Sequence, residues 1–61
     1  MNDQLLRRPE VERKTGMSRS AIYRDMSAGT FPKPKRIGKR AVAWPASSIE
    51  AWIAERPFTD A

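Results

Sequence analysis

A set of polar residues at helical spacing is the first feature of this sequence that could carry chemistry. They fall on one face of a helix expected over residues 18–28, whereas Ala21, Ile22 and Met26 fall on the other face. Arginine can pair with guanine through two hydrogen bonds, serine can donate to or accept from several bases, and tyrosine can reach a phosphate or a thymine methyl group. The pattern therefore predicts a face that contacts duplex DNA. Its members are Arg19, Ser20, Tyr23, Arg24 and Ser27.

A second set consists of five cations within eight residues, shortly after this helix. Pro34 and Gly38 interrupt the run and exclude a helix there. A basic hairpin beside a recognition helix can cross the phosphate backbone and reach the adjoining minor groove. We expect most of these cations to attract phosphates, and Lys39 or Arg40, at the tip, to enter the groove. The five are Lys33, Lys35, Arg36, Lys39 and Arg40.

The charge of the chain is polarised along its length. Residues 7–40 hold eleven Lys and Arg against three acidic residues, a net +8, and the remaining residues carry −3. Such an asymmetry is the electrostatic signature of a nucleic-acid binder, although it does not specify the partner.

The residue inventory argues against several other classes. The 61 residues include no Cys and no His, which removes disulfides, thiolate metal sites and the commonest general base. Glu10 and Glu12 diverge on a helix and cannot form a carboxylate pair. No apolar run approaches the ~20 residues of a membrane span, and the N-terminal residues do not form a signal peptide. We expect no enzyme activity, metal or cofactor, and a cytoplasmic location.

Two short helices with a tight connection are expected to hold the first set of residues. Pro9 suits the first turn of a helix over residues 9–15, and Gly16 suits its left-handed end. Ser18 is expected to be the N-cap of the second helix and Gly29 its C-terminal stop. This spacing is typical of a helix-turn-helix, whose second helix enters the major groove.

The remaining elements are a hairpin and a third helix. We expect one strand at Ile37 and another over residues 41–44, joined by a turn at residues 38–40. Ser47 and Glu50 have the spacing of a capping box at the start of a helix that ends before Pro57.

The predicted fold is mainly α with a small β-hairpin, a three-helix winged helix-turn-helix. We expect one domain over residues 1–61, with an ordered core at about 5–56. The predicted core residues are Leu6, Val11, Met17, Ile22, Met26, Phe31, Ile37, Val42, Trp44, Ile49, Trp52 and Ile53.

Several segments together resemble one family, the AlpA-type phage transcriptional regulators. They are Leu-Leu-Arg-Arg-Pro-Glu-Val (5–11), Thr-Gly-Met-Ser-Arg-Ser-Ala-Ile-Tyr-Arg (15–24), Gly-Thr-Phe-Pro-Lys-Pro (29–34), Ile-Gly-Lys-Arg-Ala-Val-Ala-Trp (37–44) and Ile-Glu-Ala-Trp-Ile (49–53). The resemblance implies a winged helix-turn-helix related to the MerR DNA-binding domain and to phage excisionases. It places Ser18, Arg19, Ser20, Tyr23 and Arg24 on the recognition helix, and Gly38, Lys39 and Arg40 in the wing.

The expected function is that of a double-stranded DNA-binding regulator of prophage or genomic-island genes, such as integrase or excision genes. One alternative is an excisionase-type factor that bends attachment-site DNA. Another is a protein-interaction module, which would show no salt-dependent DNA affinity and would expose an apolar patch. We expect two or more copies on adjacent sites, because one small module makes a small interface, and no small-molecule effector.

Overall fold

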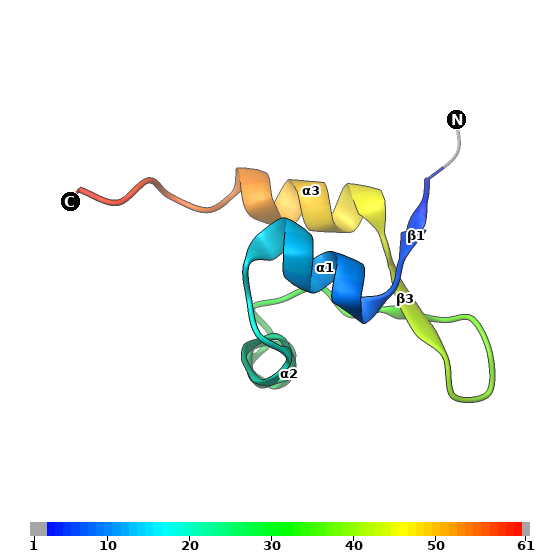
Figure 1. Cartoon of the computed structure of the whole chain (residues 1–61). Coiled ribbons are helices and arrows are strands. Elements are labelled where there is room, and N and C mark those ends of the chain that lie inside the picture. Colours follow the sequence, from blue (N-terminus) through cyan, green and yellow to red (C-terminus); the bar gives the residue numbers. More distant parts are fainter. Residues whose placement is uncertain (1–2, 61) are drawn as a thin grey trace.

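A computed structural model of the chain describes residues 3–60 and shows three helices and a small sheet. In chain order the elements are β1 (Leu5–Leu6), α1 (Arg8–Thr15), α2 (Arg19–Ala28), β2 (Lys35–Arg36), β3 (Val42–Pro45) and α3 (Ala46–Ala54). Figure 1 shows α1 and α3 lying over one another, α2 seen end-on beneath them at the lower left, and the β2–β3 hairpin projecting at the lower right. The winged helix-turn-helix expected from the sequence is confirmed.

The sheet has three antiparallel strands in the order β1-β3-β2. Leu6 is paired with Trp44 and Arg36 with Val42, so β3 is the central strand. Sequence analysis did not predict β1, because a strand of two residues is too short to show a period. Its effect is to hold the N-terminal segment against the second half of the chain.

The start of α3 corrects the predicted capping box. The helix begins at Ala46 with Pro45 as its N-cap, so Ser47 lies inside it and does not cap it. The cap comes instead from the N-terminal segment: the Asp3 carboxylate accepts hydrogen bonds from Ser47 N at 3.0 Å and Ser47 Oγ at 2.6 Å. Gln4 O accepts from Ala46 N at 2.7 Å. These bonds satisfy N–H groups that a helix leaves free in its first turn.

The core is small and mostly as predicted. Its buried cluster consists of Leu6, Val11, Ile22, Phe31, Trp44 and Ile49, and Met17, Met26, Val42, Ala46 and Trp52 pack against it. The predicted burial is wrong for two residues, since Ile37 is 44% exposed and Ile53 is 41% exposed. Ile37 follows β2 in the projecting hairpin, where no other element covers it, and Ile53 lies in the last turn of α3. The predicted strand at Ile37 is also wrong, because β2 ends at Arg36.

The third helix is far shorter than a bilayer. Among residues 3–60, no helix combines the length and the apolar character needed to cross a membrane.

Candidate nucleic-acid interface

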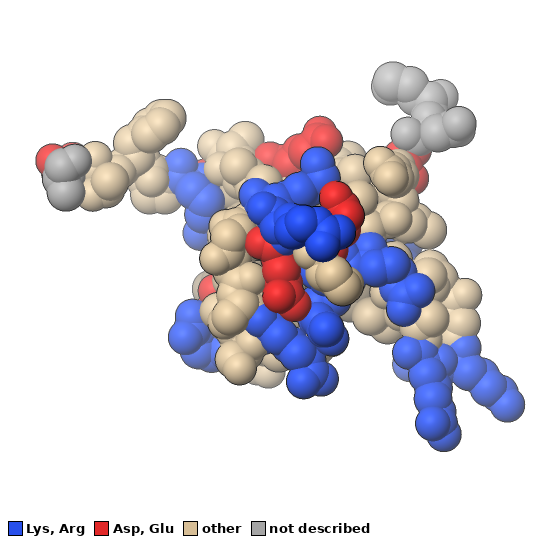
Figure 2. All heavy atoms as spheres, in the orientation of Figure 1, with Lys and Arg blue, Asp and Glu red and all other residues tan. Residues whose placement is uncertain are grey.

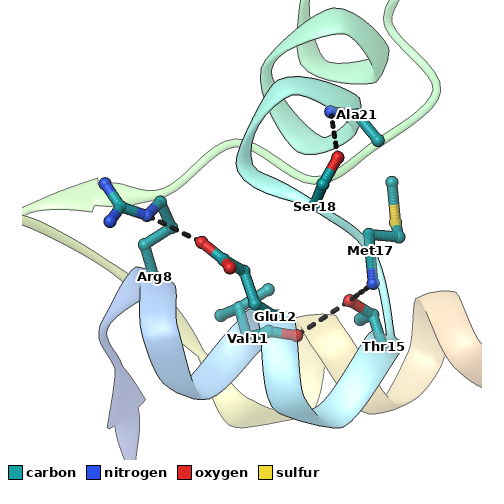
Figure 3. A network of polar contacts seen from close by, with 7 residues as sticks. All are labelled: Arg8, Val11, Glu12, Thr15, Met17, Ser18 and Ala21. Carbon is teal, nitrogen blue, oxygen red and sulfur yellow. Dashed lines mark hydrogen bonds and ion pairs between the residues drawn. The ribbon is translucent and has the colours of Figure 1, made fainter.

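The connection between α1 and α2 is fixed by one side chain and one glycine (Figure 3). Thr15 Oγ1 donates to Val11 O at 2.8 Å and accepts from Met17 N at 3.2 Å, so it joins the last turn of α1 to the connecting segment. Gly16 follows with φ 74°, a left-handed conformation that costs glycine little. The turn that sets the two helices at a steep angle is therefore determined by residues 15 and 16.

The N-cap of α2 is the one predicted. Ser18 has extended dihedral angles, and its Oγ accepts from Ala21 N at 3.2 Å (Figure 3). Gly29 closes the helix in the left-handed region with φ 78°. Both ends of α2 are thus set by local chemistry, which explains why they could be predicted from sequence.

The outward face of α2 presents the predicted residues to solvent. Arg19, Ser20, Tyr23, Arg24 and Ser27 are all exposed. Ile22, on the opposite face, is fully buried, so the helix cannot rotate to hide its polar side without exposing a core residue. This arrangement has the geometry that reading of a DNA groove requires.

Neighbouring side chains constrain two of the arginines on this face. The Arg19 guanidinium lies 5.4 Å from the centre of the Tyr23 ring, a cation–π distance. Arg24 Nε lies 3.2 Å from Asp25 Oδ1, but the Arg24 side chain is 73% exposed. An ion pair this open to solvent is weak and can be exchanged for a base or a phosphate.

Lys33 lies beside α2. A shallow hollow of about 360 Å³ is lined by Tyr23, Met26 and Ser27 of α2 and by Lys33 from the segment that follows. The fold therefore brings Lys33 to the face of α2, whereas the other four predicted cations belong to the hairpin.

The hairpin forms the predicted basic wing. Ile37 N donates to Ala41 O at 2.9 Å and closes the loop, and Arg36 Nη1 donates to Lys39 O at 3.0 Å across it. Arg36, itself exposed, therefore supports the shape of the wing loop, a role that the sequence did not indicate. Lys35, Lys39 and Arg40 are exposed and make no ion pair within residues 3–60.

The basic charge is divided by the fold into paired and unpaired groups. On α1, Arg8 is bonded to Glu12, and Arg13 to Glu10, so these cations are largely neutralised locally. Figure 2 shows Lys and Arg side chains extending along the lower edge, over the regions of α2 and the wing, whereas over α1 the Lys and Arg atoms lie among Asp and Glu atoms. Much of the basic charge thus lies along the edge where α2 and the wing project.

Thr15, Trp44 and Trp52 shape this site without belonging to its outer surface. Thr15 could have been recognised from its position just before a helix-ending glycine. The two tryptophans are predicted core residues. Their indole N–H groups also donate hydrogen bonds, Trp44 Nε1 to Pro32 O and Trp52 Nε1 to Thr30 O, which the sequence could not indicate.

An exposed polar second helix, a fixed turn and a basic hairpin together define a winged helix-turn-helix protein. The family model described as Prophage CP4-57 regulatory protein (AlpA) matches residues 4–57. The chain belongs to this family, as its motifs predicted.

Two relatives show how far the similarity extends. The chain is 43% identical over 54 residues to the "Uncharacterized protein ORF88" of Enterobacteria phage P4, which covers 88% of this chain and 61% of that protein. It is 36% identical over 58 residues to the "DNA-binding transcriptional activator AlpA" of Escherichia coli (strain K12), which covers 85% of this chain and 83% of that protein. The chain thus spans less than two thirds of the length of the phage P4 relative.

Proposed function

We propose that this chain is a transcriptional regulator that binds specific sequences in double-stranded DNA. The observation that carries the proposal is that every predicted polar residue of α2 is exposed, and that α2 and the basic wing project from the same side of the molecule. The family relationship supports it, because one relative is named a DNA-binding transcriptional activator.

In the proposed complex, α2 enters the major groove. Arg19, Ser20, Tyr23 and Arg24 contact base edges and the flanking phosphates. Ser18 Oγ already accepts a bond from Ala21 N, so its hydroxyl hydrogen is left for a phosphate oxygen. Ser27 and Lys33 lie further along the same face and contact the backbone.

The wing contacts the next stretch of backbone. Lys35, Lys39 and Arg40 attract phosphates, and the tip reaches toward the minor groove. Arg36 contributes indirectly, because its hydrogen bond to Lys39 O keeps the tip in shape. One module of this size buries a small interface, so we propose that two or more copies bind adjacent sites.

The proposed targets are prophage or genomic-island genes, including integrase and excision genes, and the proposed location is the cytoplasm. No effector molecule takes part in the proposed mechanism, and the protein acts by binding DNA rather than by catalysis.

The decisive experiment is selection of bound sequences from randomised duplexes at near-physiological salt, followed by a salt titration on the enriched sequence. A defined motif whose affinity falls steeply as salt rises is the expected result. Salt-sensitive binding without a motif would indicate an architectural factor of the excisionase type. Absence of binding even at low salt would refute the proposal and favour a protein-interaction module.

A further inference from the structure

Residues 29–34 connect the recognition helix to the wing, and the segment of residues 30–32 is the middle of this connection. Its start is tied to α2, since Thr30 N and Thr30 Oγ1 both donate to Asp25 O, at 2.9 and 3.2 Å. Proline at positions 32 and 34 further restricts the backbone of this connection. The orientation of the wing relative to α2 therefore depends on how this segment is held.

Two tryptophans from different elements hold it through their indole N–H groups. Trp52 Nε1, on α3, donates to Thr30 O at 2.9 Å. Trp44 Nε1, on β3, donates to Pro32 O at 2.8 Å. Each indole has a single donor, and both donors are used on the same short segment.

Phe31 completes the arrangement between the two carbonyls. Its ring meets both indoles edge-on, with centroids 4.9 Å from Trp52 and 6.5 Å from Trp44. Phe31 is 4% exposed and Trp44 is fully buried, so the segment is fixed by packing as well as by hydrogen bonds. Any displacement of residues 30–32 would break both kinds of contact together.

Trp44 also links this arrangement directly to the wing. It belongs to β3, whose preceding residues pair with β2, Ala43 with Lys35 and Val42 with Arg36. One continuous set of contacts thus runs from the last turn of α2, through residues 30–32, to the strands that carry the wing cations.

We propose that Trp44 and Trp52 are positioning residues that fix the wing relative to the recognition helix, and so determine which phosphates the wing reaches once α2 is in its groove. This inference rests on the proposed function. It assigns the two indoles a part in DNA recognition although neither touches DNA.

The test measures how much the wing contributes to affinity with and without one indole donor. Trp52→Phe removes the N–H and keeps an aromatic ring, and Arg56→Gln is the matched control. Arg56 lies 4.6 Å from the centre of the Trp52 ring, so the control disturbs the same indole but leaves its hydrogen bond in place. The wing-tip pair Lys39→Ala and Arg40→Ala is then added to the wild-type chain and to each variant, and affinity for the selected duplex is measured.

Trp52→Phe is expected to weaken binding about two- to tenfold, the range for loss of one hydrogen bond. The wing-tip pair should cost less affinity in that background than in the wild type or in Arg56→Gln. Hydroxyl-radical footprints should keep the protection due to α2 and lose that due to the wing. A purely structural tryptophan would lower stability, measured by thermal unfolding, without changing the wing's contribution.

An equal wing contribution in the Trp52→Phe and wild-type backgrounds, with the wild type binding specifically, would overturn the inference alone. A wild-type chain that binds no duplex would instead overturn the proposed function, and the role in recognition with it. If Trp52→Phe does not fold, 3-benzothienylalanine at position 52 replaces the N–H with sulfur in a ring of almost the same shape, and the same comparison applies.

Discussion

On the surface of α2 and the wing, single side chains have different tasks. Arg24 projects from the middle of α2, with its side chain 73% exposed beside Asp25. Lys39 lies at the wing tip and makes no ion pair among residues 3–60. A planar guanidinium can select a base through two hydrogen bonds, whereas a lysine ammonium acts mainly as a point charge.

Arg24→Ala should therefore change the base preference of the protein. We expect a loss of about 1–3 kcal/mol on the selected sequence and a relaxed preference at one position of the motif. Lys39→Ala is the contrasting control. It should weaken binding to all DNA sequences alike and reduce the slope of log affinity against log salt concentration by about 1. Competition binding with single-base variants of the site measures both effects. A uniform loss for Arg24→Ala would show that this residue contacts only phosphate.

At the scale of elements, the helix-turn-helix depends on the Thr15 hydroxyl. This group both donates to Val11 O and accepts from Met17 N, so it bridges the end of α1 and the turn. Thr15→Val has nearly the same shape and leaves Met17 N without that acceptor. We expect a loss of about 1 kcal/mol in unfolding free energy, measured by urea denaturation. Unchanged stability would mean that water replaces the hydroxyl.

Gly16 offers a separate measure of the same turn. A Cβ at this position would meet nothing within 4 Å, so only the backbone conformation, with φ 74°, opposes a side chain. Gly16→Ala should therefore destabilise the fold by about 1–2 kcal/mol. Gly38→Ala is a suitable control, because Gly38 does not have a positive φ. Equal effects at both positions would contradict a cost specific to the left-handed conformation.

At the scale of the whole molecule, Asp3 joins the N-terminal segment to α3. Hydrogen bonds from the Ser47 hydroxyl and the Ser47 backbone N–H hold the pKa of the Asp3 carboxyl below its ordinary value. Since the folded pKa is lowered, the stabilisation is fully present above the unfolded pKa, about 3.9, and is lost as pH falls through the folded pKa.

Asp3→Asn should accordingly lower Tm at neutral pH, because it removes the charge and one acceptor oxygen. The difference in Tm between the variant and the wild type should shrink as pH falls below about 4 and disappear once Asp3 is protonated. Thermal unfolding between neutral and strongly acidic pH measures this. Asp60→Asn, which makes the same change of charge beyond the end of α3, is the control. A difference independent of pH would contradict the role of the ionised carboxylate.

The features that could be predicted from sequence are those decided by neighbouring residues. Ser18 and Gly16 define the ends of their helices by local hydrogen bonding and backbone preference. The Asp3 cap and the β1 strand depend on partners about forty residues away, so no local sequence pattern predicts them. The predicted burial of Ile37 was wrong for a related reason. Its apolar character predicts burial, but Ile37 lies in the projecting hairpin and is exposed.

In the candidate site, too, the features that could be predicted are those decided by local sequence. The exposed residues of α2 were predicted because a helical period separates them from Ile22. The indole bonds to residues 30–32 arise from tertiary packing, whereas the bond from Arg36 Nη1 to Lys39 O depends on the shape of the hairpin loop. For α2, the sequence thus predicts which side chains face outward, and the fold determines how their supports are arranged.

The pairing of residues 3–6 with β3 and α3 has a consequence for biosynthesis. A ribosome releases this segment long before its partners, since Asp3 and Ser47 are 44 residues apart. At the usual elongation rate this delay is on the order of seconds. During it the helix-turn-helix is already synthesised but lacks Trp44 and Ile49 of its core. The nascent chain can therefore complete its core only after Trp44 and Ile49 have emerged, and we expect the proposed DNA binding to appear no earlier.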